Sequence, residues 1–312
     1  MPAPELVQHL RAHPGHRPHV AHVETLPPKE PIYGDIGRPL PEPLAIYLAH
    51  RGIRLYCHQA DALERVRAGK NVVITTPTAS GKTLAFNLPI FERFDAEPQA
   101  TALYLYPTKA LANDQLKTVQ ELEKFTGIGA NASVYDGDTP PGRRPAIRQR
   151  ARIVITNPYE VHQILSYHHT WSRFLRSLRF VVIDEAHRYR GVFGSQVAGL
   201  VRRVRRIASF YGSKPQFILS TATLANPEEF ALRLTGLPCD LVDRDGSPSG
   251  MKRFVLYNPY ARGDTGRSVH QVTKDLLLTC LDHRLQTLCF TTSRKMTELI
   301  TQWSREELGG RR

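Results

Sequence analysis

The chain has 312 residues, of which 41% are hydrophobic and 23% charged, so it can bury one large core or two ordinary ones and is not a disordered polypeptide. No apolar run approaches the roughly 18 residues of a membrane-spanning helix, and the start is rich in Pro and His, unlike a signal peptide. We therefore expect a cytoplasmic protein with no membrane partner. The net charge of +13 and the pI near 9.8 favour a polyanionic partner, most commonly nucleic acid.

Residues 1–50 are predicted to form an extension rich in proline and histidine. Five of its histidines lie close together in the sequence, at positions His9, His13, His16, His19 and His22. Pro14, Gly15 and Pro18 break any helix that would align these imidazoles. A metal site is one interpretation, and a solvated, partly extended arm is the favoured one. Residues 44–50 have the pattern of a short helix.

Residues 51–245 alternate short apolar strands with helices. Strands are predicted at residues 71–75, 101–106, 132–135, 152–156, 180–183 and 216–220. Helices are predicted at residues 109–125, 159–166, 195–211 and 227–235. Such alternation predicts an α/β domain with a mostly parallel sheet, whose ligands lie at the carboxyl ends of the strands.

Looser segments at residues 243–250 and 262–266 place a linker region at 246–266. Residues 267–312 then predict a helix at 269–282, a strand at 287–291 and a helix at 294–307. One strand and two helices cannot complete a parallel sheet, and unpaired strand edges favour aggregation. We therefore expect residues 267–312 to be the incomplete start of a second α/β unit.

A phosphate-binding loop is predicted between the strand at 71–75 and a helix that begins near Gly81. The loop consists of Thr76, Pro77, Thr78, Ala79, Ser80, Gly81, Lys82 and Thr83. Small residues that end in Gly-Lys-Thr let backbone amides and the helix dipole face an anion. Lys82 would contact the outer phosphates, and the Thr83 hydroxyl would hold Mg²⁺. Thr76 stands where the usual pattern has glycine, and an ordinary strand-to-helix turn is the alternative that the flanking segments disfavour.

Two carboxylates directly follow the apolar strand at 180–183. Asp184, at the strand end, is predicted to hold the Mg²⁺ of a nucleotide bound at Lys82. Glu185 would orient or deprotonate the attacking water. A pair of helix-capping acids is the alternative, but an upstream phosphate loop needs such a partner. Together these three residues predict an NTPase with Glu185, Lys82 and Asp184 as its catalytic groups.

Residues 184–187, Asp-Glu-Ala-His, resemble the second motif of the superfamily-two DEAD/DEAH-box helicases. Further motifs follow in that family's order: residues 106–112 resemble motif Ia, 156–159 motif Ib, 220–224 motif III and 289–294 motif IV. Residues 55–59 resemble the segment whose glutamine contacts adenine. The phrases at 78–83, 135–139 and 223–227 are similar to bacterial mitomycin-repair helicases and their RecQ-like fungal relatives.

The resemblance implies a RecA-like first lobe, the beginning of a second RecA-like lobe, ATP and Mg²⁺ as ligands, and DNA rather than RNA as partner. It implies that Gln59 contacts adenine, that Thr83 and Asp184 bind Mg²⁺, and that Glu185 is the catalytic base. Coupling of nucleotide state to DNA grip would involve His187, Thr221 and Thr223. The loops expected to hold one DNA strand contain Pro107, Thr108, Lys109, Gly137, Thr139, Thr156 and Pro158. Hydroxyls and backbone donors in such loops suit phosphate contacts, so sequence-independent, salt-sensitive binding is expected.

These features predict an ATP-dependent DNA helicase or translocase core that binds single-stranded or tailed DNA, with a role in DNA repair. The family's motifs V and VI do not occur in this sequence, and the arginine finger of motif VI is worth about 10³–10⁵ in turnover. An ATP- and DNA-binding module without motor activity is therefore the alternative, and a non-helicase P-loop ATPase is a third hypothesis. The run Arg202, Arg203, Arg205 and Arg206 is either a DNA-binding stripe or, as favoured, a solvated helix face.

Overall fold

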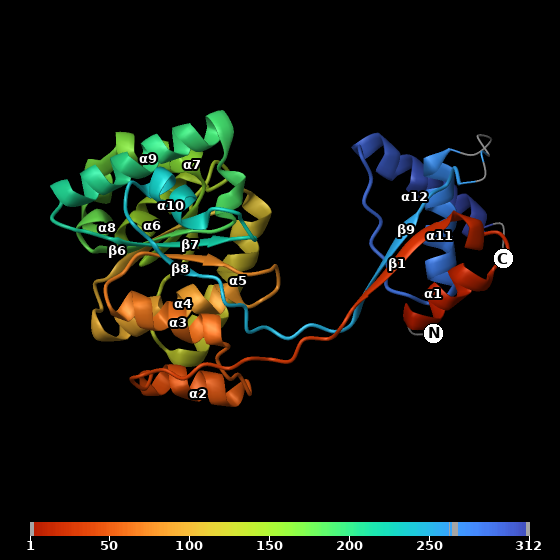
Figure 1. The fold of residues 1–312 in the computed structure, drawn as a ribbon. Helices are drawn as coiled ribbons and strands as arrows, with labels where there is room; N and C mark the ends of the chain where they lie inside the picture. The colour runs from red at the N-terminus through yellow and green to blue at the C-terminus, as the bar shows by residue number, and fades with distance from the viewer. Residues whose placement is uncertain (1–2, 262, 264–267, 310–312) are drawn as a thin grey trace. The chain divides into compact units, whose positions relative to one another are not determined.

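The computed structural model describes residues 3–261, 263 and 268–309, and the chain divides into two units (Figure 1). The larger unit is Glu30–Ser249, and the smaller unit combines Met1–Lys29 with Gly250–Arg312. This division differs from the boundaries expected at residues 50, 245 and 266. It differs because residues 20–26 pair with residues beyond the larger unit, whereas residues 30–50 belong to the larger unit itself. The loose segment expected at 262–266 lies, except for Gly263, outside the described residues.

The larger unit is built on a seven-stranded parallel sheet with the strand order β4-β5-β3-β6-β7-β2-β8. Its strands are β2 (Val72–Thr75), β3 (Thr101–Leu105), β4 (Ser133–Val134), β5 (Ile153–Thr156), β6 (Leu178–Ile183), β7 (Gln216–Thr221) and β8 (Asp240–Val242). The central strands are continuous apolar runs because both of their faces are buried. The predicted α/β fold with a parallel sheet is confirmed, and β8 is an additional strand.

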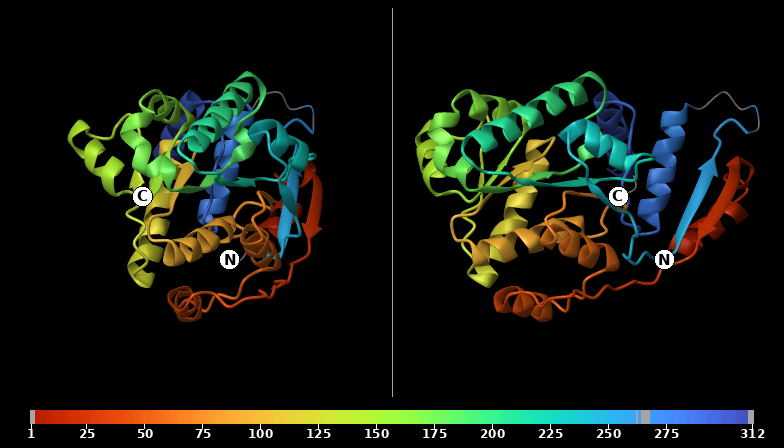
Figure 2. Two further views of the ribbon diagram at one scale, coloured as in Figure 1. Left: turned by 90° about the vertical axis from the view of Figure 1, so that its left-hand side faces the viewer. Right: turned by 60° about the vertical axis from the view of Figure 1, so that its left-hand side comes forward.

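Helices cover both faces of this sheet (Figure 2). One face carries α2 (Glu42–His50), α3 (Cys57–Arg67), α4 (Lys82–Ala96) and α5 (Lys109–Thr126). The other carries α6 (Arg144–Arg150), α7 (Pro158–Ser166), α8 (Ser172–Arg176), α9 (Gly191–Phe210) and α10 (Pro227–Thr235). Successive side chains of a strand point to opposite faces, so Ile74 packs in the first layer and Val73 in the second. Short 3-10 turns are η2 (Pro141–Arg143), η3 (His168–Trp171) and η4 (Ala186–Arg188).

The arginine run on α9 holds the end of a neighbouring helix. Arg202 Nη2 donates to the Arg233 carbonyl at 3.1 Å, and Arg205 Nη1 donates to the Thr235 carbonyl at 2.9 Å. The last carbonyls of a helix lack intrahelical donors and carry partial negative charge, so cations stabilise them. Two of the four arginines thus cap α10. This role is neither a DNA-binding stripe nor a purely solvated helix face, the two alternatives considered from the sequence.

Residues 30–36 and 243–246 lie together against the start of α3. The Ile32 amide donates to the Gly246 carbonyl, and the Cys57 amide donates to the Ile32 carbonyl, both at 2.9 Å. Cys57 Sγ also contacts the Arg244 carbonyl at 3.2 Å. A Cβ atom at Gly246 would overlap the Ile32 carbonyl oxygen and lie 2.7 Å from Cys57 Sγ. Only glycine fits this backbone crossing.

Replacing Gly246 by alanine should therefore destabilise the larger unit by about 1–3 kcal/mol, the usual cost of overpacking. Urea unfolding followed by circular dichroism measures this change. Gly250→Ala is the matched control, because no atom lies within 4 Å of the Cβ position at Gly250. Equal midpoints for Gly246→Ala and the parent chain would contradict the packing argument.

The smaller unit contains an antiparallel ribbon of β1 (Val20–Leu26) and β9 (Lys252–Tyr257). Its helices are α1 (Ala3–Ala12), α11 (Val269–Asp282) and α12 (Arg294–Gly309), and η1 (Arg17–His19) precedes β1. The helices predicted at 269–282 and 294–307 are confirmed. The strand predicted at 287–291 is wrong, because no described segment pairs with it. Leu288 and Phe290 are 83% and 89% exposed there.

The N-terminal histidines belong to this folded unit. The predicted solvated, partly extended arm is wrong for residues 3–12, which form a helix, whereas residues 20–26 are extended and mostly exposed. The His9 ring lies 5.2 Å from the His13 ring and 5.0 Å from the His283 ring, and His16 Nδ1 lies 3.1 Å from the Tyr257 hydroxyl. Burial and neighbouring imidazoles lower the pKa of His9 and His16. Within the described part of the chain, no three His, Cys, Asp or Glu side chains are arranged to hold a metal ion. No described helix is long and apolar enough to cross a bilayer.

Candidate nucleotide and nucleic-acid site

Six of the loops singled out in the sequence leave the carboxyl edge of the parallel sheet, in two groups. The adjacent strands β6, β7 and β2 lead into residues 184–187, 222–224 and 76–83. The adjacent strands β3, β5 and β4 lead into residues 106–112, 157–159 and 135–139. Ligands of parallel sheets bind at this edge. The strand order therefore separates the predicted nucleotide loops from the predicted DNA loops.

The loop at residues 76–83 reverses the chain between β2 and α4 with two left-handed residues, Ala79 at φ 61° and Gly81 at φ 84°. The hydroxyls of Thr76 and Ser80 lie 2.7 Å apart, and both residues are buried. This bond closes the loop and gives Thr76 a structural role where the common pattern has glycine. Glycine is favoured at position 81 by its φ of 84°, and a Cβ there would also displace the Gln59 amide, whose Nε2 would lie 2.5 Å away.

Lys82 lies across this loop. Its Nζ donates to the carbonyls of Thr76 at 2.8 Å and Pro77 at 2.7 Å. Burial lowers the pKa of Lys82, and the nearby carboxylates of Glu185 and Asp184 oppose that shift. The ammonium group is thus within electrostatic reach of both acids predicted from the sequence, as a phosphate site requires.

Helix α3 holds the phosphate loop through two consecutive side chains. Gln59 Nε2 donates to the Gly81 carbonyl at 3.0 Å, and Gln59 Oε1 accepts from the Tyr56 amide at 2.9 Å. His58 Nδ1 accepts from the Gly246 amide at 3.3 Å, so its Nε2 carries the proton and donates to the Ser80 carbonyl at 3.0 Å. The adenine contact of Gln59 stays a prediction, since its amide bonds within the protein here. His58 was not predicted, because nothing local shows that both its partners lie far along the chain.

Asp184 and Glu185 occupy the turn after β6. Asp184 is buried, which raises the pKa of its carboxyl, and its Oδ1 accepts from the Glu185 amide at 2.9 Å. Glu185 adopts φ 51°, a left-handed conformation that is rare for a residue with a Cβ atom and is common at functional sites. Its Oε2 lies 3.4 Å from His187 Nδ1. One acid is thereby fixed inside the sheet edge, and the other is half-exposed beside it.

Oxygen donors at this place fit a magnesium ion, which prefers carboxylate and hydroxyl oxygens. Thr83 Oγ1 accepts from Gln115 Nε2 at 3.4 Å. Gln115 Oε1 is buried and has no hydrogen-bond partner among the described residues. Asp184 and Thr83 would hold the ion, as predicted, and Gln115 is an amide beside them that the sequence did not single out.

Residues 221–223 connect the acid pair to the phosphate-loop strand. The Ala222 amide donates to His187 Nδ1 at 3.3 Å. The Ala222 carbonyl accepts from Thr221 Oγ1 at 3.0 Å and from Thr75 Oγ1 at 3.4 Å. His187 and Thr221 therefore meet at one residue, whereas the Thr223 side chain is exposed. The coupling role of all three stays a prediction.

The second group of loops uses several of its threonines internally. Thr156 Oγ1 donates to the Tyr135 carbonyl at 2.6 Å, Thr139 Oγ1 accepts from the Asp136 amide at 2.9 Å, and Thr108 Oγ1 caps α5. Both Thr139 and Thr156 are buried, as is Pro158. Pro107 is half-buried, whereas Lys109 and Gly137 are exposed. Contacts to a strand would thus come from Lys109 and backbone groups, and the buried hydroxyls shape the loops.

A sequence model described as DEAD/DEAH box helicase matches residues 56–230, a span that contains both groups of loops. The chain belongs to the DEAD/DEAH box helicase family. It is 45% identical over 272 residues to the ATP-dependent helicase YprA of Bacillus subtilis, covering 84% of this chain and 36% of YprA. It is 36% identical to the ATP-dependent helicase Hrq1 of Schizosaccharomyces pombe, covering 92% of this chain and 28% of that protein.

Crystal structures of the DUF1998 helicase MrfA bound to DNA, and to DNA with AMPPNP, match with a TM-score of 0.92 and 41% sequence identity. They cover 98% of this helicase chain and 43% of MrfA. The seven-stranded parallel unit thus has the RecA-like helicase fold. The chain spans about a third of the length of the two curated relatives, covering 36% of one and 28% of the other.

Proposed function

We propose that this chain is the ATP- and DNA-binding core of a helicase or translocase that acts on single-stranded or tailed DNA in DNA repair. The observation that supports this most is the strand order, which brings the loops of Lys82 and of Asp184 and Glu185 to the sheet edge that also presents the second group of loops. The names of YprA and Hrq1 as ATP-dependent helicases, and the DNA-bound state of MrfA, point the same way.

In this proposal, the residues of the first group of loops bind ATP and promote attack on its outer phosphate. Lys82 and the loop amides hold the phosphates, and Thr83 with Asp184 would hold Mg²⁺, which supplies charge neutralisation when bound. Glu185 accepts the proton of the attacking water. His187 would link Glu185 to residues 221–223, since its Nδ1 accepts from the Ala222 amide at 3.3 Å and the same nitrogen lies 3.4 Å from Glu185 Oε2.

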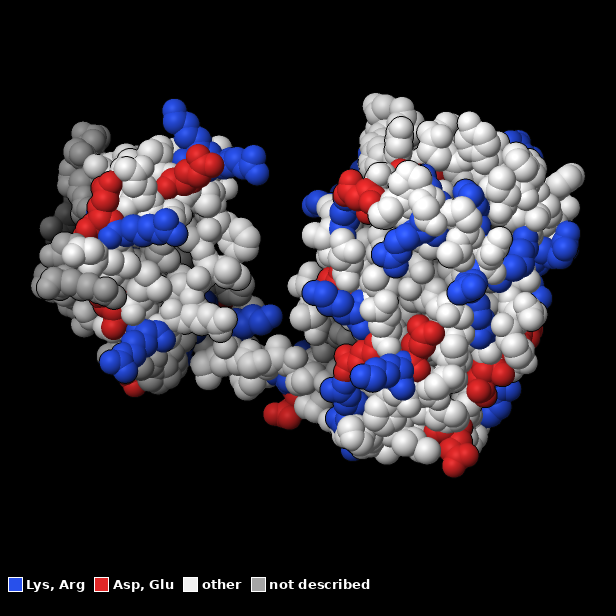
Figure 3. All heavy atoms as spheres, turned by 180° about the vertical axis from the view of Figure 1, so that it is seen from behind, with Lys and Arg blue, Asp and Glu red and all other residues white. Residues whose placement is uncertain are grey.

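The second group of loops would hold the sugar–phosphate backbone of one strand. On the face shown in Figure 3, lysine and arginine side chains of the larger unit are interspersed with acidic ones. The net charge of +13 is therefore not gathered on that face into one continuous basic stripe. Lys109 and the loop amides would supply phosphate contacts at the second group of loops.

An ATP- and DNA-binding module without motor activity is the second candidate function. The observation that favours it is the make-up of the smaller unit, whose described residues form a two-stranded ribbon and helices rather than a parallel sheet. Among those residues, the smaller unit therefore has no edge of parallel strands like the one that carries the loops of the larger unit.

ATP turnover of the whole chain, measured with and without single-stranded DNA at several salt concentrations, tests the proposal. We expect DNA to stimulate turnover, and log affinity to fall linearly with log salt by about 0.7 per phosphate contact on a single strand. DNA binding without stimulation would favour the non-motor module. ATP turnover without salt-dependent DNA affinity would favour an ATPase unrelated to nucleic acid.

A further inference from the structure

His58, in the first turn of α3, joins two segments that lie far apart in the sequence. The side chain is fully buried. Its Nε2 donates to the Ser80 carbonyl at 3.0 Å, and its Nδ1 accepts from the Gly246 amide at 3.3 Å. A proton on Nδ1 would face the N–H group of Gly246, so these two bonds select a single tautomer of the ring. His58 therefore ties the phosphate loop to the segment at Gly246 with a fixed direction of donation.

The bond to Ser80 sets the direction of the amide that follows it. The Ser80 carbonyl and the Gly81 N–H group belong to one planar trans peptide group, in which they point in opposite directions. The Gly81 carbonyl is held in the same way by Gln59 Nε2 at 3.0 Å, which directs the Lys82 N–H group. Both amides thus point away from α3, and neither has an acceptor among the described residues. Amides held in this way are the donors that a phosphate oxygen needs.

The other end of the link is a backbone crossing that holds the imidazole ring in place. The Gly246 carbonyl accepts from the Ile32 amide, and the Ile32 carbonyl accepts from the Cys57 amide, both at 2.9 Å. Cys57 directly precedes His58, so the crossing and the ring are attached to the same turn of α3. The bond from the Gly246 amide to Nδ1 therefore fixes the rotation of the ring, and with it the direction in which Nε2 donates.

We propose that His58 is a positioning residue for the phosphates of ATP, because it holds the peptide between Ser80 and Gly81 so that the Gly81 amide donates to a phosphate oxygen. This inference rests on the proposed ATP-binding function and adds to it a residue that does not itself contact the nucleotide. A hydrogen bond to a charged group contributes about 10- to 150-fold in affinity. A loss within this range is expected when the Ser80 carbonyl is released.

Two substitutions separate the two bonds of the ring. The amide of glutamine reaches the place of Nε2, so His58→Gln still donates to the Ser80 carbonyl. The shorter amide of asparagine reaches only the place of Nδ1, so His58→Asn accepts from the Gly246 amide and leaves Ser80 without its donor. In displacement of a fluorescent ATP analogue by ATP, His58→Asn should bind about 10- to 150-fold more weakly than the parent. His58→Gln should rescue most of that loss.

A role in packing alone gives a different result, because each variant removes one bond of a buried ring. The two variants would then have the same affinity for ATP once both are shown to be folded by circular dichroism. Equal ATP affinities in His58→Asn and His58→Gln, or weaker binding in His58→Gln, would overturn the positioning role.

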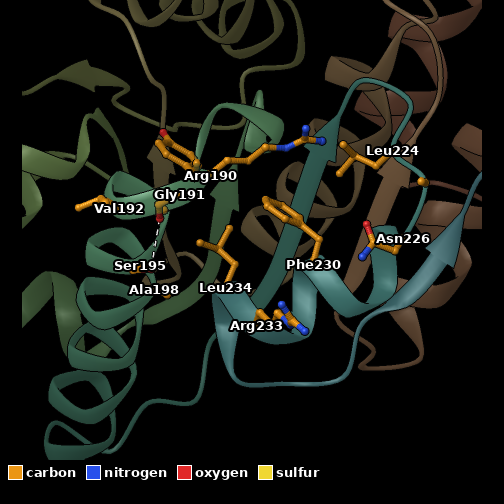
Figure 4. A pocket seen from close by; sticks show the side chains of 13 residues that line it. Arg190, Gly191, Val192, Ser195, Ala198, Leu224, Asn226, Phe230, Arg233 and Leu234 are labelled. Carbon is orange, nitrogen blue, oxygen red and sulfur yellow. Dashed lines mark hydrogen bonds between the residues drawn. The ribbon is translucent and has the colours of Figure 1, made fainter.

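Ser195→Ala is the control for losing a side-chain bond to a backbone carbonyl. Ser195 Oγ donates to the Gly191 carbonyl at 3.2 Å (Figure 4). Ser195 lines a cavity of about 740 Å³ between α9 and α10, and no residue of the phosphate loop belongs to that lining. The affinity of Ser195→Ala for ATP should equal that of the parent chain.

Nitrogen NMR signals of the His58 ring test the same inference in the parent chain, without a substitution. We expect a protonated Nε2 and an unprotonated Nδ1 at neutral pH. The opposite tautomer would overturn the positioning role even where a variant does not fold, since Nε2 could not donate to Ser80. Failure of the parent chain to bind ATP would instead overturn the proposed ATP-binding function, and the positioning role with it.

Discussion

Glu185→Gln should lower DNA-stimulated ATP turnover by about 10²–10⁴-fold, the usual contribution of a positioned general base. The amide has the shape of the carboxylate but cannot accept a proton from water. Glu185 is set in a left-handed turn at φ 51°, 3.4 Å from His187 Nδ1, and its side chain is half-exposed. The substitution leaves Lys82 and the phosphate loop intact. The contacts that bind ATP before the reaction are therefore unchanged, and the affinity for ATP should stay within roughly a few-fold of the parent value.

Steady-state turnover and the dissociation constant of a fluorescent ATP analogue, measured on the same preparations, separate the two quantities. Glu228→Gln is the control, since Glu228 is an exposed acid on α10 and should leave both values unchanged. Undiminished turnover in Glu185→Gln would assign the base to another group. A parallel loss of ATP affinity and turnover would show that Glu185 shapes the binding site instead.

The nucleotide loops could be predicted because each is carried by consecutive residues. Residues 76–83 join a strand to a helix, and Asp184 directly follows an apolar strand, so type and spacing already specify their chemistry. Helices 227–235 and 269–282 could be bounded to the residue, since Pro227 starts one and Ser268 caps the other. Strand ends differ by one or two residues because pairing rather than propensity decides where a strand stops.

Contacts between distant segments could not be predicted. The β1–β9 ribbon pairs Val23 with Val255. Neither segment has a clear alternation of apolar and polar residues, so the sequence did not predict that they pair. Residues 287–291 have strand propensity but no described neighbour, and a strand requires one. Thr139 and Thr156 were placed among the DNA-holding residues by the family resemblance, whereas tertiary contacts use both hydroxyls inside the loops. The sequence thus predicts which polar residues lie near a site more easily than it predicts the hydrogen-bond partners of those residues.

Lys82→Ala should weaken ATP binding and lower turnover by about 10²–10³-fold, the loss expected when one preorganised charged donor is removed from a phosphate site. Lys82 Nζ bonds the Thr76 and Pro77 carbonyls, so the variant also loses two contacts within the loop. That loss should leave global stability nearly unchanged, because burial of the ammonium group itself opposes its charged state and lowers its pKa. A thermal melt in the absence of nucleotide checks this point.

Lys109→Ala is the matched control for Lys82→Ala, because it removes a lysine from the other group of loops. Lys109 is exposed and lies 2.5 Å from Asp138 Oδ2. Its loss should reduce DNA affinity and lower the salt slope by up to about 0.7, with ATP affinity unchanged. The two variants should therefore fail in opposite assays, since the strand order places their loops at separate halves of one sheet edge. Loss of ATP binding in both variants would contradict that separation.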